Sequence, residues 1–146
     1  MKVLVVSEDV KERQRATSAL ELHTELAVHE AATAAEAHQR LLVDQENFDV
    51  LVVDGDLQPR GGYALLYDLR MDAELAGKPA TPALVLYERD EDIWLAKWAG
   101  ASAWERKPVD PFRVAQVASE LVGSEVPPYG DQGSVEDQLS AALRGL

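Results

Sequence analysis

Short apolar runs that alternate with helix-like segments constrain the fold of this chain more than any other feature. The runs occur at residues 2–6, 26–31, 50–53, 83–87 and, more weakly, 102–104. Apolar runs of this length, separated by helical stretches, are typical of parallel strands joined by helical crossovers. The sequence therefore predicts one α/β domain built from five strand–helix units.

Helix start signals fall between these runs. Asp9 can cap a first helix, and Thr33 with Glu36 forms a capping box before a second. We expect a third helix over residues 62–70 and a fourth from about residue 90 to near Gly100. A fifth is expected to begin at Pro111, because proline is favoured in the first turn.

The composition changes after residue 122. Residues 123–133 are rich in Pro, Gly and Ser and are predicted to link a domain of residues 1–122 to a short helix over residues 134–146. That last segment has a capping box and an apolar face, formed by Ser134 with Asp137 and by Val135, Leu139, Leu143 and Leu146. A helix this short is marginal alone in water, so it either frays, docks on its own domain or docks on a partner.

The acidic composition excludes several classes of protein. The chain has 26 acidic residues against 14 Lys and Arg, and its net charge of −12 repels a phosphate backbone, so we expect no nucleic-acid binding. The absence of cysteine excludes disulfides, thiolate nucleophiles and cysteine metal sites, and the three histidines lack metal-ligand spacing. The sequence shows no signal segment and no apolar run of membrane-spanning length, which predicts a cytoplasmic protein without membrane contact.

Charged side chains stand where predicted strands end. Glu8 follows the first strand, Asp54 follows the third, and Lys107 follows the fifth. The carboxyl ends of parallel strands meet at one edge of a sheet, so we expect these groups to face one another. A carboxylate can accept a phosphoryl group when a hard cation such as Mg²⁺ and a fixed lysine neutralise the moving oxygens. Asp9 is interpreted as a helix cap rather than as a ligand.

Other interpretations stay open at this point. Asp54-Gly55 is also a common turn dipeptide at the end of a strand. A small doubly wound hydrolase with Asp54 as nucleophile is a further alternative, although this short chain offers no cap domain and no obvious second catalytic acid. Trp94 and Trp98 share one face of the fourth predicted helix, where they serve either core packing or the docking of a partner.

At these residues the chain resembles the receiver domain of two-component response regulators, over residues 2–122. Gly62 stands eight residues after Asp54, and residues 100–102 precede Lys107 and Pro108, as in that family. The resemblance implies a doubly wound five-stranded parallel sheet in the order 2-1-3-4-5, the flavodoxin-like (CheY-like) three-layer α/β/α fold. It also implies that a histidine kinase or phosphotransfer protein phosphorylates Asp54 next to Lys107. Mg²⁺ would be held by Glu8, Asp54 and the backbone carbonyl of Asp56.

Several positions depart from the pattern of the family. Ser7 replaces the first of two acids, which weakens the expected Mg²⁺ site, and Glu8 stands where the family usually has Asp. Tyr87 occupies the place of a short Thr or Ser hydroxyl that contacts the phosphoryl group. Trp104 occupies the place of the switch aromatic that moves inward together with that hydroxyl. With two bulky rings the inward movement would overpack the region, which is costly.

The loops around the site add further differences. Asp56 and Glu88 bring extra negative charge if their side chains turn toward Asp54, which disfavours a dianionic phosphoryl group. Pro59 lies one place later than the common proline of the family. The Lys107–Pro108 bond is a candidate for a cis peptide, as the family commonly shows.

We therefore expect an atypical stand-alone receiver, a signalling module that works by protein–protein contact without a working phosphorylation switch. The alternative is a phosphorylation-competent single-domain receiver that accepts a phosphoryl group on Asp54. In either case we expect no enzyme activity beyond self-phosphorylation from a phosphodonor and autodephosphorylation at Asp54. The resemblance implies a kinase or phosphotransfer protein and a downstream target as partners. It also allows a homodimer through the face of the fourth helix, fifth strand and fifth helix.

Overall fold

The strands pair in parallel in the order β2-β1-β3-β4-β5 in the computed structural model, which describes residues 1–124 and 126. They are β1 (Lys2–Val6), β2 (Ala27–Ala31), β3 (Val50–Asp54), β4 (Ala83–Tyr87) and β5 (Ala103–Arg106). Each neighbouring pair is parallel and in continuous register. The predicted sheet and its strand order are therefore confirmed.

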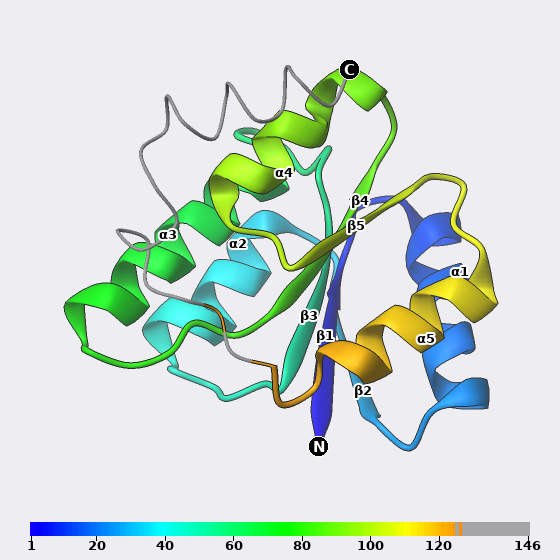
Figure 1. The fold of residues 1–146 in the computed structure, drawn as a ribbon, viewed down its shortest axis with the longest axis horizontal. Helices are drawn as coiled ribbons and strands as arrows, with labels where there is room; N and C mark the ends of the chain where they lie inside the picture. The colour runs from blue at the N-terminus through cyan, green and yellow to red at the C-terminus, as the bar shows by residue number, and fades with distance from the viewer. Residues whose placement is uncertain (125, 127–146) are drawn as a thin grey trace.

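Helices connect the strands and cover both faces of the sheet (Figure 1). They are α1 (Val10–His23), α2 (Ala34–His38), α3 (Gly62–Leu75), α4 (Ile93–Ala99) and α5 (Pro111–Leu121). A short π-helical turn, η1 (Gln39–Val43), continues α2, and a 3₁₀ turn, η2 (Asp90–Asp92), precedes α4. α1 and α5 lie on one face, whereas α2, α3 and α4 lie on the other. This is the three-layer α/β/α arrangement that the resemblance implied.

Each face of the sheet has its own apolar core, because successive side chains of a strand point to opposite faces. On the side of α2, α3 and α4 the strands contribute Leu4, Val6, Leu51, Val53 and Val85. On the side of α1 and α5 they contribute Val3, Val5, Val50, Val52, Leu84 and Leu86. β3 is buried along its whole length, as expected for a central parallel strand covered on both faces. The sheet is thus a rigid base for the residues at its ends.

Some element boundaries differ from the prediction. α3 continues to Leu75 instead of ending at residue 70, because the first helix breaker after it is Gly77, with a φ of 67°. The first turn expected for α4 is the 3₁₀ turn η2, and β2 begins one residue later than expected. β5 covers residues 103–106 rather than 102–104. Among the described strands it pairs only with β4, and its polar residues interrupt the apolar pattern by which a strand is recognised.

The predicted caps of α1 and α2 are confirmed. Asp9 Oδ1 accepts a hydrogen bond from Glu12 N–H at 3.1 Å, and Thr33 Oγ1 accepts one from Glu36 N–H at 3.1 Å. α4 ends at Gly100, whose φ of 84° is a left-handed C-cap conformation that favours glycine. These caps define where α1 and α2 begin and where α4 ends.

After α5 the chain returns toward the loop between α3 and β4. Val126 forms an isolated antiparallel bridge with Ala80 in that loop and is 7% exposed. Most of the predicted linker and the whole predicted helix over residues 134–146 lie outside the described residues. None of the helices in the described part of the chain has both the length and the apolar character that a membrane crossing requires.

Candidate functional site

The predicted site residues meet at the carboxyl ends of β1 and β3. Val6 pairs with Val53 in the sheet register, so Ser7 and Asp54 follow at nearly the same level. Lys107 directly follows β5 and reaches Asp54 across the end of β4. The topology thus brings Ser7, Asp54 and Lys107 into direct contact.

Hydrogen-bond donors enclose the Asp54 carboxylate. Its Oδ2 accepts a bond from Ser7 Oγ at 2.9 Å. Its Oδ1 accepts bonds from Lys107 Nζ at 2.8 Å and from Asp56 N–H at 3.0 Å. The Asp54 side chain is 5% exposed, and Ser7 is fully buried. Partners of this kind are what allow a carboxylate to stay charged inside a protein.

The Lys107 ammonium joins two carboxylates. Its Nζ lies 2.8 Å from Asp54 Oδ1 and 2.7 Å from Asp56 Oδ2. Burial alone lowers the pKa of Lys107, but hydrogen bonds to Asp54 and Asp56 and their negative charges outweigh it and raise the pKa above the ordinary 10.5. Lys107 therefore carries a fixed positive charge at neutral pH. Its backbone N–H donates to Tyr87 O at 2.7 Å, and the Lys107–Pro108 peptide is cis, as expected.

Asp56 enters the site through its side chain. The resemblance implied that Asp56 contributes its backbone carbonyl. Its carboxylate was expected to add charge to the site only if the side chain turned inward. In the structure the carboxylate turns to Lys107, while 46% of the side chain remains exposed. Asp56 lies in the turn that follows β3, so the path of this turn directs its carboxylate toward Lys107.

Glu8 lies at the edge of the site and holds the loop after β3. Its Oε1 accepts a hydrogen bond from Gln58 N–H at 2.6 Å. The same loop contains a second cis peptide, Gln58–Pro59, which the sequence analysis did not predict. The Glu8 contact therefore ties the end of β1 to the loop that follows Asp54.

The carboxylates at this edge supply the oxygen donors that Mg²⁺ prefers. However, Lys107 already binds the Asp54 and Asp56 carboxylates, and Ser7 supplies a hydroxyl instead of a further carboxylate. Within residues 1–124, no group of three acidic or histidine side chains is arranged to hold a metal ion. A cation at Glu8, Asp54 and Asp56 therefore has to compete with Lys107.

The two predicted switch positions lie on neighbouring strands. Tyr87 ends β4, is half-buried and is opposite Arg106 of β5. Trp104 is opposite Val85 and packs against the core on the side of α3 and α4. Lys97 Nζ of α4 lies 5.4 Å from the centroid of the Trp104 ring. Trp104 is thus packed between the core and α4.

Tyr63 is a residue near the site that the sequence analysis missed. Its ring lies over Gly55, where an added Cβ would be 2.5 Å from Tyr63 Oη. Tyr63 is 8% exposed, and its buried hydroxyl has no hydrogen-bond partner among the described residues. Burial first, and then the charges of Asp92 and Asp56, raise the pKa of this phenol well above its ordinary 10.0. No sequence signal marks it, because a tyrosine in the first turn of α3 is typical of ordinary core packing.

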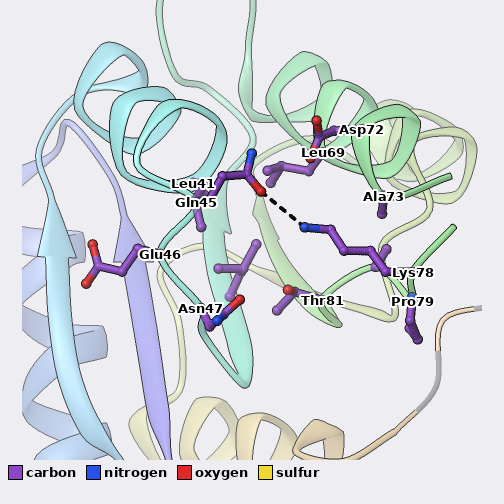
Figure 2. Close-up of a pocket in the computed structure, with 12 residues that line it drawn as sticks. Leu41, Gln45, Glu46, Asn47, Leu69, Asp72, Ala73, Lys78, Pro79 and Thr81 are labelled. Carbon is purple, nitrogen blue, oxygen red and sulfur yellow. Dashed lines mark hydrogen bonds between the residues drawn. The ribbon is translucent and has the colours of Figure 1, made fainter. Parts of the chain in front are cut away.

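A shallow cavity of about 50 Å³ lies at the opposite edge of the sheet (Figure 2). Its walls come from η1, β3, the end of α3 and the loop before β4. Lys78 Nζ donates to Gln45 Oε1 across it at 3.2 Å. The cavity contains none of the predicted site residues and has space for a few water molecules at most.

The similarity of this chain to known proteins extends beyond these individual residues. No family model matches the chain. Over 127 residues it is 34% identical to an uncharacterized response regulatory protein of Mycobacterium tuberculosis, in strains CDC 1551 and H37Rv, with 84% of this chain and 91% of that protein covered. It is similar in structure to the chemotaxis response regulator CheY4 of Vibrio cholerae, with a TM-score of 0.69 and 25% identity over 82% of this chain and 97% of that chain. The receiver domain of NtrX from Brucella abortus shares the fold, with a TM-score of 0.70 and 21% identity over 84% of this chain and 99% of that chain. The similarity therefore covers most of the chain rather than a single motif.

Proposed function

The chain belongs to the response regulators as a receiver domain, and we propose that it is an atypical receiver that works by protein–protein contact, with Asp54 held out of phosphoryl transfer. The observation that carries the proposal is that both oxygens of the Asp54 carboxylate accept hydrogen bonds. Ser7 Oγ, Lys107 Nζ and the Asp56 N–H all donate to it, and its side chain is 5% exposed.

An attacking carboxylate needs an oxygen lone pair aligned with the bond that breaks. Here both Asp54 oxygens already accept hydrogen bonds, and bonds to the charged form stabilise it and so lower its reactivity. Ser7 supplies one of these bonds from a position where the family usually has a metal-binding acid. The change at Ser7 therefore removes one metal ligand and adds one donor to the acceptor.

The Lys107 ammonium neutralises much of the carboxylate charge that a metal ion would otherwise neutralise. Two carboxylates about 4 Å apart repel by about 4 kcal/mol at an effective dielectric of 20, and the Lys107 ammonium lies between Asp54 and Asp56. Mg²⁺ supplies charge that neutralises phosphoryl oxygens when it is bound. Glu8, Asp54 and the backbone carbonyl of Asp56 would hold it in this chain. Its affinity would be weak, because Lys107 competes and Ser7 adds no charge.

Protein contact is assigned to the face formed by α4, β5 and α5. Trp94 of α4 is 40% exposed. Exposed aromatic side chains are typical anchors of protein interfaces. The partner is a downstream target, a kinase or phosphotransfer protein, or a second copy of the chain.

The test is intact-mass measurement of the full chain after incubation with Mg²⁺ and acetyl phosphate, with Asp54→Asn treated in parallel. The proposal predicts no adduct at any Mg²⁺ concentration, while a phosphorylation-competent receiver in the same buffer gains one phosphoryl group. A single adduct on the native chain that is absent from Asp54→Asn would overturn it.

A phosphorylation-competent receiver is the second candidate. The 2.8 Å contact between Asp54 and Lys107 favours it, because a lysine at this distance can neutralise the negative charge of a phosphoryl group on Asp54. In this case a histidine kinase or phosphotransfer protein donates the group, and the adduct described above is the expected result. Repeated turnover of a phosphate ester would instead support the hydrolase alternative.

A further inference from the structure

The described chain ends beside one end of α3. Val126 bridges Ala80, which lies five residues after the last residue of α3, Leu75. Val126 is also buried, so this contact fixes the point from which the remaining residues continue. The exit point therefore lies on the side of the sheet covered by α3 and α4.

The outer side of α3 and α4 carries an apolar stripe, which we call the α3–α4 stripe. It consists of Tyr67, Met71, Leu75 and Trp98. The three residues of α3 follow one another at four-residue spacing, which places them on one side of the helix. Trp98 of α4 stacks on Tyr67, with ring centroids 5.0 Å apart and an angle of 6° between the planes.

Most of the stripe lies outside the two cores of the domain. Neither core contains Tyr67, Met71 or Leu75, and Leu75 is 85% exposed. Trp94, one turn before Trp98, is 40% exposed next to the stripe. α3 and α4 lie side by side (Figure 1), so together they offer a surface long enough for another helix.

The last segment of the chain matches this surface in pattern and length. As a helix, residues 134–146 would carry four apolar side chains on one face, those of Val135, Leu139, Leu143 and Leu146. As a helix these 13 residues are about 20 Å long, and the 14 residues of α3 are about 21 Å long. Residues 127–133 span at most about 25 Å when extended, which suffices to reach the stripe from Val126.

We propose that residues 134–146 dock as an amphipathic helix along the α3–α4 stripe, antiparallel to α3, with their apolar face toward Tyr67 and Trp98. This inference does not depend on whether Asp54 accepts a phosphoryl group. A helix docked there covers the side of α4 that faces α3. It does not cover the side of α4 that faces β5, where Lys97 lies over the Trp104 ring.

The absence of cysteine allows a specific test with the full chain. Ala141→Cys places a nitroxide label opposite the apolar face of the segment, where it does not interfere with docking. In ¹⁵N-labelled protein, the proposal predicts broadened amide signals in α3 and α4 and unchanged signals in α1 and α5. A label at Glu21→Cys on α1, an exposed position, should give the reverse pattern.

Two controls separate this docking from other contacts. Leu139→Asp with Leu143→Asp should abolish the broadening, whereas Ser134→Asp with Ser140→Asp adds the same charge off the apolar face and should preserve it. Nitroxide-labelled protein mixed with unlabelled ¹⁵N protein reports contacts between molecules. Broadening that appears in this mixture at equal strength, or none in α3 and α4 of the labelled molecule itself, would overturn the proposal.

Discussion

Ser7 Oγ lies 2.9 Å from Asp54 Oδ2, and both residues are buried at the ends of neighbouring strands. The Ser7 hydroxyl stabilises the Asp54 carboxylate without adding a negative charge of its own. One ammonium, that of Lys107, therefore serves both Asp54 and Asp56. The identity of residue 7 thus determines how much positive charge the site requires.

Replacing Ser7 by Asp should make the stability of the fold depend on Mg²⁺. The new carboxylate would lie beside Asp54, and such a pair repels by about 4 kcal/mol at an effective dielectric of 20. We expect the free energy of unfolding to fall by about 2–4 kcal/mol in EDTA. Mg²⁺ should recover much of the loss, because an ion that binds only the folded state stabilises it. Urea denaturation in EDTA and in Mg²⁺ measures both effects.

Ser18→Asp is the matched control for this change. Ser18 is exposed on α1, so the variant adds the same charge away from the site. Its free energy of unfolding should change by less than about 0.5 kcal/mol in either condition. An equal response of the two variants to Mg²⁺ would contradict a cation site at Glu8 and Asp54.

The Lys107 ion pairs predict a loss of stability at high pH. In the folded protein the pKa of Lys107 is raised from 10.5, because hydrogen bonds to Asp54 and Asp56 outweigh the effect of burial. A group with a raised folded pKa stabilises fully below its unfolded pKa and loses this contribution as the pH rises toward the folded value. The stabilisation should be constant from about pH 7 to pH 10 and decline above that.

Lys107→Met provides the reference for this measurement. At pH 7 we expect it to be less stable than the native chain by about 2–4 kcal/mol, because it leaves Asp54 buried without its cation. Urea denaturation of both proteins between about pH 7 and pH 11 should show this difference shrinking above about pH 10.5. A difference that stays constant over the whole range would show that the ion pairs do not stabilise the fold.

The two carboxylates bound to Lys107 should contribute unequally. Asp54 is 5% exposed and Asp56 is 46% exposed, and solvent screens the second pair much more strongly. Double-mutant cycles that combine Lys107→Met with Asp54→Asn or Asp56→Asn should give coupling free energies of about 2–3 kcal/mol and below about 1 kcal/mol, respectively. Equal couplings would mean that Asp56 is as well shielded from water as Asp54.

The sheet could be predicted because its inner strands are almost completely buried. β1 and β4 have the predicted bounds, since a parallel strand covered on both faces is a continuous apolar run between polar loops. β5 was predicted less well, because Glu105 and Arg106 of this edge strand face a more polar environment. The side chains of an edge strand are less buried, so such a strand tolerates charged residues and lacks a continuous apolar run.

The meeting of Asp54 and Lys107 follows from topology alone, because both stand at carboxyl ends of strands in one sheet. The orientation of Asp56 onto Lys107 and the position of Tyr63 over Gly55 depend instead on the loop between β3 and α3. The sequence marks this loop as a turn but does not specify its path. Side-chain contacts that depend on the path of a loop therefore could not be predicted from the sequence.

The two tryptophans on one side of α4 should differ in what they stabilise. Trp98 stacks on Tyr67 and packs against the core, whereas Trp94 is 40% exposed. We expect Trp98→Ala to lower the free energy of unfolding by about 2–4 kcal/mol and Trp94→Ala by less than about 1 kcal/mol. Urea denaturation compares them directly. Similar losses in both variants would show that Trp94 belongs to the packing of the domain rather than to its contact surface.

Tyr63→Phe should make the protein more stable, which is an uncommon result for a buried residue. The Tyr63 hydroxyl is buried and has no hydrogen-bond partner among the described residues, so the cost of removing it from water is not offset. Phenylalanine keeps the ring over Gly55 and removes only this oxygen, so we expect a gain of about 1 kcal/mol in urea denaturation. Tyr63→Leu, which also removes the ring, should instead cost about 1–3 kcal/mol. A loss of stability in Tyr63→Phe would mean that the hydroxyl donates a hydrogen bond in solution, and Asp56 and Asp92 are then the acceptors to substitute next, because their charges already act on the phenol.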